Sequence, residues 1–177
     1  MSVVRKASPC PDPPYLFTYP DGSSRGGIAV SLSDYRTLEQ EIYLNDVVID
    51  FYLLYLINTV LPEEFRQSIY VFSSMFLKHL INRFGNCEEE DDEILSPVLR
   101  HMRVKNWTKD VNIFEKKLIG FPICKDDHWF LILVIRPDLM TTSIISKNEH
   151  PFIVLLDSVG NGQATALESI REYMQVE

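Results

Sequence analysis

Two short apolar runs stand out in the second half of the chain, and each is bounded by polar residues. The first covers residues 130–135 and follows the polar segment 125–129; the second covers 152–156 and is followed directly by Asp157. Both runs are rich in β-branched and aromatic residues and have the length of a buried strand. The pattern therefore predicts two central strands, which we expect to pair antiparallel.

Antiparallel pairing would bring His128, at the start of the first strand, beside Asp157, at the end of the second. In a register that sets the two residues opposite each other, their Cβ atoms would lie roughly 5 Å apart on one face of the sheet. An imidazole oriented by a carboxylate is two thirds of a Cys-His-Asp or Ser-His-Asp triad. The residues alone leave a second interpretation open, in which His128 caps a strand and Asp157 begins a turn.

Periodicity and turn residues predict the other elements. Segment 43–57 is apolar on almost every side of a helix, which is typical of a helix buried inside a domain, and Asn45 is its expected N-cap. The remaining expected elements are strands at 15–19 and 28–30, a short helix capped by Ser31 or Ser33, a strand or turn at 71–72 followed by a helix, a short basic helix at 96–103, a hairpin at 111–123 and an amphipathic helix at 164–174. This order predicts an α+β fold with a mixed or antiparallel central sheet.

The 177 residues are enough for one domain with a real core. The proline-rich stretch 1–14 is expected to be a flexible leader, and residues 15–177 to form part of a single protein domain. Six consecutive carboxylates at 88–93 indicate a solvated acidic loop, although such a run could also bind a basic partner. Residues 136–151 lack strong periodicity and are expected to form a long connecting loop.

Composition narrows the classes of function. The net charge of −8, from 17 basic and 25 acidic side chains, argues against binding to nucleic acid or to an anionic membrane through bulk charge. No apolar run reaches the ~18 residues of a membrane span. No metal-ligand spacing and no glycine-rich phosphate loop occurs, so we expect no metal and no cofactor. Cys10, Cys87 and Cys124 have no paired spacing, which suggests a reducing compartment.

A set of short motifs occurs in a specific order along the chain. They are Tyr19-Pro20, Gly26-Gly27-Ile28, the helix start at 44–52, the segment 104–109, His128-Trp129, Leu156-Asp157-Ser158 and the segment 171–177. In this order they resemble the Ulp/sentrin-specific cysteine proteases, which process the ubiquitin-like modifier SUMO and cleave it from target proteins. The long spacing between His128 and Asp157 is similar to the branch with an insertion there, which is associated with trimming poly-SUMO chains. The resemblance implies a papain-like (Ulp-type) fold, of which this chain would hold the N-terminal portion.

The resemblance also implies roles for five residues. His128 matches the catalytic general base, and Asp157 matches the carboxylate that fixes the tautomer of its imidazole. Trp129 matches an aromatic lid over the tunnel that takes the Gly-Gly tail of SUMO, and Tyr43 stands where the family has a second tunnel aromatic, often Trp or Phe. Only glycines, which lack Cβ, would thread between two rings. Asp46 matches an acid that pairs with a SUMO arginine, unless it is only a helix-start acid.

The family's nucleophile has no counterpart in these residues. It should lie in a Cys-Gly segment at the start of a helix well after the Asp, with an oxyanion-stabilising Gln several residues before it. No cysteine follows Cys124, and Gln163 lies too soon after Asp157 to match that Gln. Neither Cys124 nor the earlier Cys10 and Cys87 is expected at a helix N-terminus, which would favour a thiolate. We therefore expect this chain to be inactive alone.

The absence of the family's nucleophile from these residues has two explanations. The chain could be the N-terminal portion of a SUMO-specific isopeptidase or endopeptidase, with the missing C-terminal part of the protease domain as its partner. It could instead be a truncated pseudoenzyme that binds SUMO or another partner without cleavage. The residues also leave open a protease for another ubiquitin-like modifier and an interaction domain unrelated to SUMO. The expected partners are SUMO and SUMO-conjugated proteins, and the resemblance implies a nuclear location, with the cytoplasm as a second one. Without a C-terminal partner, apolar surface near 152–156 would be exposed.

Overall fold

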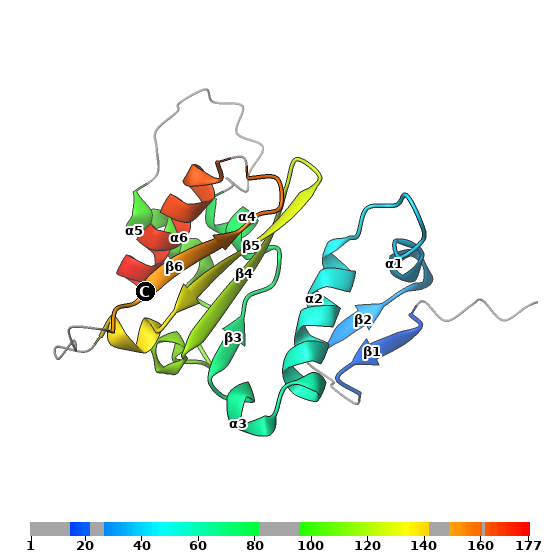
Figure 1. The fold of residues 1–177 in the computed structure, drawn as a ribbon, viewed down its shortest axis with the longest axis horizontal. Coiled ribbons are helices and arrows are strands. Elements are labelled where there is room, and N and C mark those ends of the chain that lie inside the picture. Colours follow the sequence, from blue (N-terminus) through cyan, green and yellow to red (C-terminus); the bar gives the residue numbers. More distant parts are fainter. Residues whose placement is uncertain (1–14, 22–26, 82–95, 142–148, 161) are drawn as a thin grey trace, which may run out of the picture. The chain divides into compact units, whose positions relative to one another are not determined.

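A computed structural model describes residues 15–21, 27–81, 96–141, 149–160 and 162–177 (Figure 1). The chain divides into two compact units, Met1–Phe51 and Tyr52–Glu177, and each is considered by itself. The expected leader at 1–14 and the expected acidic loop at 88–93 lie outside the described residues.

The first unit contains a small sheet and a capped helix. Strand β1 (Phe17–Tyr19) pairs antiparallel with β2 (Ile28–Val30), which confirms the two predicted strands. Helix α1 (Leu32–Arg36) begins after Ser31, whose hydroxyl accepts from the backbone N–H of Asp34 while the Asp34 carboxylate accepts from the N–H of Ser31. This reciprocal arrangement is a capping box, and it satisfies two donors at the helix start that otherwise lack partners.

Helix α2 (Asp46–Tyr55) starts at the predicted place, and a π-helical turn (Leu56–Val60) continues it. The prediction that this helix is buried was wrong, because none of its residues is buried and the Tyr52 side chain is 55% exposed. A helix that is apolar on almost every side needs neighbours on every side, and the described residues do not enclose it. Leu61 ends the turn in an extended conformation, as the residue before a proline prefers.

The second unit is built on one four-stranded mixed sheet. Its strands lie in the order β3 (Ile69–Val71), β4 (Leu118–Lys125), β5 (His128–Ile135) and β6 (Phe152–Leu156). Strand β3 is parallel to β4, and the other two pairs are antiparallel. The antiparallel pairing predicted for the two apolar runs is therefore confirmed, and so is the α+β class with a mixed sheet.

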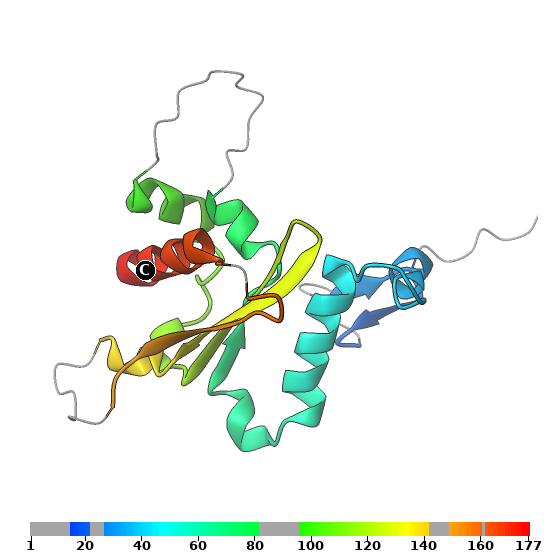
Figure 2. The same cartoon turned by 45° about the horizontal axis from the view of Figure 1, so that its top comes forward.

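Helices cover one face of this sheet. Helices α4 (Phe76–Ile81), α5 (Pro97–Val104) and α6 (Ala164–Val176) gather on that face, whereas the short α3 (Glu63–Arg66) precedes β3 (Figures 1 and 2). The 3₁₀ turn Pro137–Leu139 follows β5. Thus the predicted final helix at 164–174 is confirmed with nearly the expected bounds.

The predicted hairpin at 111–123 was wrong in its first half. Residues Ile113–Glu115 form a 3₁₀ turn rather than a strand, and only Leu118–Lys125 joins the sheet. The side-chain oxygen of Asn112 accepts from the N–H of Phe114 at 3.1 Å, and this local bond favours a turn over an extended chain. A run of apolar residues therefore became a capped turn whose Ile113 is buried in the core.

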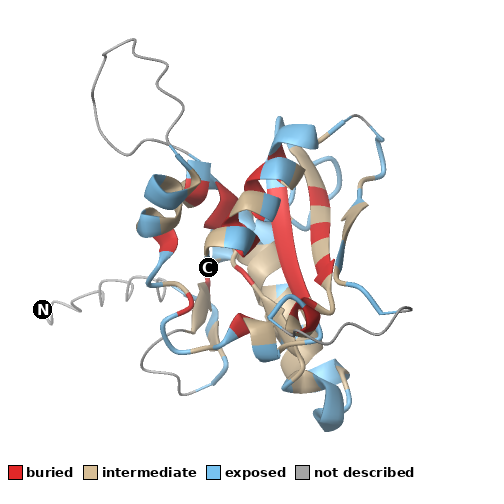
Figure 3. Ribbon diagram, turned by 90° about the vertical axis from the view of Figure 1, so that its left-hand side faces the viewer, coloured by how far each residue is buried: buried red, intermediate tan, exposed pale blue. Residues whose placement is uncertain are grey.

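The core lies between the sheet and the three helices. Every second residue of a strand faces the same side, and these positions of β4 and β5 are buried: Ile119, Phe121, Ile123, Phe130, Ile132 and Val134. Figure 3 shows the buried parts of the ribbon in red. Phe72, just after β3, stacks on Phe121 with ring centroids 4.6 Å apart, and Phe76 and Tyr173 bring rings from α4 and α6. This aromatic cluster holds the sheet that carries the two predicted catalytic residues.

Strand β6 forms one edge of the sheet and carries exposed apolar side chains. Phe152 is 53% exposed and Leu156 is 51% exposed, which confirms the expected apolar surface near 152–156. Both side chains belong to the face opposite the helices, because they pair in register with Ile135 and Leu131.

Candidate active site

A two-residue turn positions His128. Asp126 and Asp127 join β4 to β5, and both have positive φ angles, 53° and 58°. Positive φ at both central residues is typical of the type I′ hairpin turn, and aspartate tolerates this region better than most residues. The tight turn makes His128 the first residue of β5, at the end of the hairpin.

The structure brings His128 and Asp157 together. His128 Nε2 lies 2.7 Å from Asp157 Oδ1, and the carboxylate side chain is only 2% exposed whereas the imidazole is 28% exposed. The assumed register was wrong, however, because Leu131 pairs with Leu156, so the ladder continued by one residue sets Asp157 opposite Phe130. His128 and Asp157 are thus diagonal neighbours on one face, still within reach of long side chains.

A backbone donor also holds the carboxylate. Asp157 Oδ1 accepts from the N–H of Val159 at 2.9 Å, because the chain turns back after β6. This backbone hydrogen bond, and then the contact with His128, hold the pKa of Asp157 below its usual range. The ionised carboxylate therefore accepts the Nε2 proton of His128 and leaves Nδ1 as the nitrogen that can take up a proton. Sequence reasoning did not identify Val159, because a backbone donor in a turn has no side-chain signature.

Cys124 lies near His128 in the sequence but on the other face of the sheet. In the β4–β5 ladder, His128 pairs with Lys125 and Cys124 pairs with Trp129. Paired residues share a face and successive residues alternate, so the exposed Cys124 side chain points away from the face that carries the imidazole. This geometry gives Cys124 no direct approach to His128. Cys10 and Cys87 lie outside the described residues.

The three residues predicted to bind substrate lie in different parts of the chain. Trp129 is half-buried on β5, on the face opposite His128. Tyr43 is 74% exposed in the first unit, and Asp46 is the exposed first residue of α2. Their predicted roles in a tunnel and in an ion pair remain predictions.

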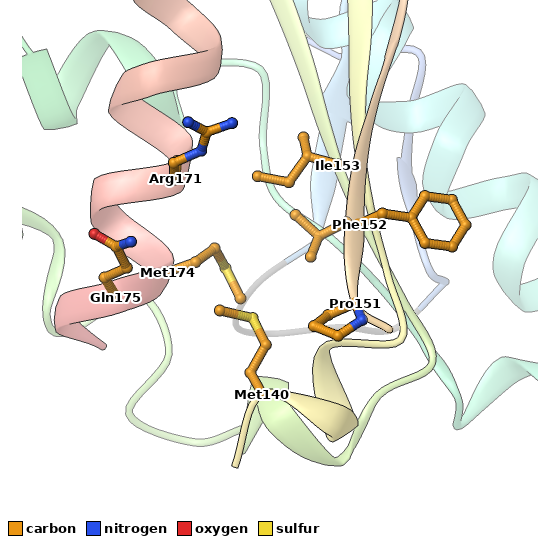
Figure 4. Close-up of a pocket in the computed structure, with 8 residues that line it drawn as sticks. Met140, Pro151, Phe152, Ile153, Arg171, Met174 and Gln175 are labelled. Atoms are coloured by element: carbon orange, nitrogen blue, oxygen red, sulfur yellow. The ribbon is translucent and has the colours of Figure 1, made fainter. Parts of the chain in front are cut away.

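A separate cavity of about 390 Å³ lies between α6 and the start of β6 (Figure 4). Its lining residues are Val134, Met140, Pro151, Phe152, Ile153, Arg171, Met174 and Gln175. The methionines, Pro151 and Ile153 point into it, whereas the ring of Phe152 points away. The cavity lies at the opposite end of β6 from Asp157, so it is not part of the His–Asp site.

Within the described ranges, no cluster of His, Cys, Asp and Glu side chains has the composition of a metal site. In the same part of the chain, no helix has both the length and the apolar character needed to cross a membrane.

An imidazole oriented by an ionised carboxylate can act as a general base, an arrangement that occurs in several classes of enzyme. Comparison with known proteins identifies the family. Residues 42–177 match the Ulp1 protease family, C-terminal catalytic domain. The chain belongs to this family. Human sentrin-specific protease 7 is 38% identical over 122 residues, which cover 69% of this chain and 12% of that protein.

Solved structures show the same fold. A de-sumoylating protease superposes with a TM-score of 0.66 at 20% identity, covering 92% of this chain and 56% of the solved chain. The Ulp1 protease domain, solved in complex with SMT3, the yeast ortholog of SUMO, has a TM-score of 0.59 at 22% identity, covering 85% of this chain and 56% of that one. The chain therefore spans about half the length of the solved domains that it matches.

Proposed function

We propose that this chain supplies the general base and part of the modifier-binding surface of a SUMO-specific cysteine protease. The observation that carries the proposal is the 2.7 Å contact between His128 and the carboxylate of Asp157, on the fold of this family. The similarity to sentrin-specific protease 7 and to a domain solved with a SUMO ortholog supports SUMO as the modifier.

The proposed reaction is hydrolysis of an isopeptide or peptide bond after the Gly-Gly tail of SUMO. A thiol supplied from outside these residues gives its proton to Nδ1 of His128 and attacks the glycine carbonyl. The imidazolium, stabilised by Asp157, then protonates the leaving amine, and water releases the acyl-enzyme. Trimming of poly-SUMO chains, action on SUMO-conjugated proteins and a nuclear location are further parts of this proposal.

A second candidate function applies to the 177 residues by themselves. Among the described residues, Cys124 faces away from His128, and this favours a module that binds SUMO without cleavage. A protease for another ubiquitin-like modifier is the third candidate. Comparing cleavage of SUMO and of other ubiquitin-like fusions by the complete enzyme distinguishes these candidates, since equal rates would remove the SUMO preference.

The general-base role is tested by His128→Ala in a complete protease domain that includes the nucleophile. We expect cleavage to fall by about 10²–10⁴-fold while SUMO binding is retained, because only proton transfer is lost. His150→Ala is the matched control, because His150 is an exposed histidine away from the site, and it should cleave normally. Near-normal cleavage by His128→Ala would refute the assignment.

The predicted role of Trp129 at the Gly-Gly tail of SUMO has a test of its own. A SUMO substrate with its Gly-Gly changed to Ala-Ala should be refused, because each alanine adds a Cβ that must find room beside the ring. Cleavage of this substrate at a normal rate would remove this role from the proposal without affecting the His–Asp pair.

A further inference from the structure

Helix α5 has one side that packs inward. Arg100 on this side forms an ion pair with the Glu172 carboxylate of α6, and the ring of His101 stacks on that of Tyr173, with centroids 5.8 Å apart. Val104 is fully buried. Arg100 and His101 lie four and three residues before Val104, so the three share one side of the helix. This side attaches α5 to the helical layer, at whose margin the helix lies (Figures 1 and 2).

The other side of α5 exposes three large apolar side chains to solvent. Val98 is 55% exposed, Leu99 50% and Met102 54%. Val98 and Met102 are four residues apart and are therefore neighbours on the helix surface, with Leu99 beside them. A single exposed apolar residue is ordinary, but adjoining ones with a polar border are typical of a surface that another molecule covers. These three residues are called the apolar patch of α5 below.

Positive charge borders the apolar patch. Lys105 lies one turn beyond it and is exposed, and Lys109 is exposed four residues later, with the Asp110 carboxylate 3.9 Å from its ammonium group. Residues 96–109 contain four lysines and arginines and no aspartate or glutamate, although the net charge of the chain is −8. Because Arg100 is paired with α6, the charge that a partner would meet first is that of Lys105.

The apolar patch and its basic border are complementary to an acidic amphipathic helix. The apolar side of such a helix would pack on the patch, and its carboxylates would lie beside Lys105. The unbranched side chain of Met102 can adapt its shape to a partner. From Val98 to Lys105 the surface is about 10 Å long at about 1.5 Å per residue, so a partner helix of two to three turns would cover it.

Nucleic acid and an anionic membrane fit this surface less well. Surfaces that bind nucleic acid are much more positively charged than those that bind proteins, and they are more polar, whereas apolar side chains occupy the centre here. A helix that lies on a membrane presents a whole apolar side to the lipid, but the inward side of α5 is already packed on α6. The net charge of −8 also repels both polyanions at longer range.

We propose that the outer side of α5 docks an acidic amphipathic helix of a partner protein. This surface contains neither His128 nor Asp157, and none of the residues predicted to bind SUMO. The proposal therefore goes beyond the proposed function and does not depend on it. A protein held on α5 would be kept beside the His–Asp site without altering that site.

Fluorescence anisotropy of a labelled peptide with the full chain tests the apolar contact. The probe is a helix-forming peptide of about 14 residues, or about four turns, with leucines along one side and glutamates beside them; a scrambled peptide is its control. Val98→Glu should weaken binding of the ordered peptide about tenfold, because it places a charge in the apolar patch. Val60→Glu is the matched control, since Val60 is 56% exposed outside α5, and it should keep the wild-type affinity. Equal results for the two peptides, or for the two variants, would overturn the proposal.

Lys105→Glu tests the charge in the same assay. It should weaken binding of the acidic peptide about fivefold and reduce the dependence of the affinity on salt. Lys125→Glu is the matched control, because it makes the same change in net charge at an exposed position of β4. Equal weakening by both variants would show that the peptide responds only to the net charge, and the docking site on α5 would be refuted.

Hydrogen–deuterium exchange locates the contact without any substitution. The ordered peptide should slow exchange of the α5 amides in the wild-type chain and leave the α2 amides unchanged, and protection confined to other elements would overturn the proposal. Tighter binding of a labelled DNA duplex than of the peptide would overturn it in favour of nucleic acid. In a complete protease domain, Val98→Glu should leave cleavage of a SUMO fusion unchanged. A loss of cleavage would place α5 in the modifier-binding surface and refute a separate docking site.

Discussion

Phe72 is the residue whose loss should damage the second unit most. Its side chain is 2% exposed, and its ring meets four others, with centroid distances of 4.1 Å to Phe76, 4.6 Å to Phe121, 4.9 Å to Tyr70 and 5.9 Å to Tyr173. These rings come from β3, α4, β4 and α6, so one side chain joins both layers of the unit.

The cost of Phe72→Ala follows from this environment. Truncation of a buried phenylalanine to alanine destabilises by about 3–5 kcal/mol, and lost ring pairs add to the transfer term, so we expect about 4–5 kcal/mol. At roughly 0.05–0.15 kcal/mol per residue, a unit of this size has a total stability of about 6–19 kcal/mol. The melting temperature should therefore fall by roughly 15–20 °C.

Urea unfolding followed by tryptophan fluorescence measures this effect, because Trp107 contacts Phe76 in the same cluster, at 5.4 Å between ring centroids. Phe65→Ala is the matched control, since the Phe65 side chain is 52% exposed and its loss should cost less than about 0.5 kcal/mol. A Phe72→Ala midpoint no lower than that of Phe65→Ala would refute the view that this cluster holds the sheet.

Three further predictions concern pH and the sheet edge. The pKa of Asp157 is lowered in the folded protein, so the ionised carboxylate stabilises the fold above the ordinary carboxyl pKa of about 3.9, and this stabilisation is lost as pH falls through the folded pKa. Asp157→Asn should therefore flatten the acid side of a curve of unfolding free energy against pH. An acid side that the substitution leaves unchanged would contradict this prediction. Burial, and then the charge of Glu177, raise the pKa of Tyr173. The neutral phenol therefore stabilises the fold fully below about pH 10, and this stabilisation is lost as pH rises further. Tyr173→Phe should reduce the loss of stability at alkaline pH in the same assay, and an alkaline side of the curve that does not change would contradict this prediction. Leu156→Lys should reduce self-association in light scattering because it places a charge on an exposed apolar edge, and an equal effect from Val98→Lys on α5 would show that the edge is not responsible.

The two residues of the candidate site could be predicted from the sequence, but the geometry between them could not. The apolar runs identified β5 and β6, and their order placed His128 and Asp157 at the same end of an antiparallel pair. The register differed from the assumed one by two residues. Nothing in the long connection between the strands fixes a register, since that depends on which side chains meet the helices.

In the first unit, Asn45 likewise makes one hydrogen bond that the sequence predicts and one that it does not. Its capping bond to Val48 was predictable, because capping is a local interaction between residues three apart. Its bond to Asp34 spans eleven residues and depends on the path of the chain between α1 and α2. No periodicity in the sequence indicates such a path, so this hydrogen bond could not have been predicted.

The sequence by itself determined the α+β class, the strand pair and the two residues of the candidate His–Asp site, because alternation, apolar runs and turn residues act over a few positions. Only the tertiary structure decided that Ile113 lies in a buried turn rather than a strand, that α2 is not enclosed and that Cys124 faces away from His128. The physical reason is the same in each case. The burial of a residue, and the face of the sheet to which its side chain points, depend on its neighbours in space, and these neighbours come from distant parts of the chain.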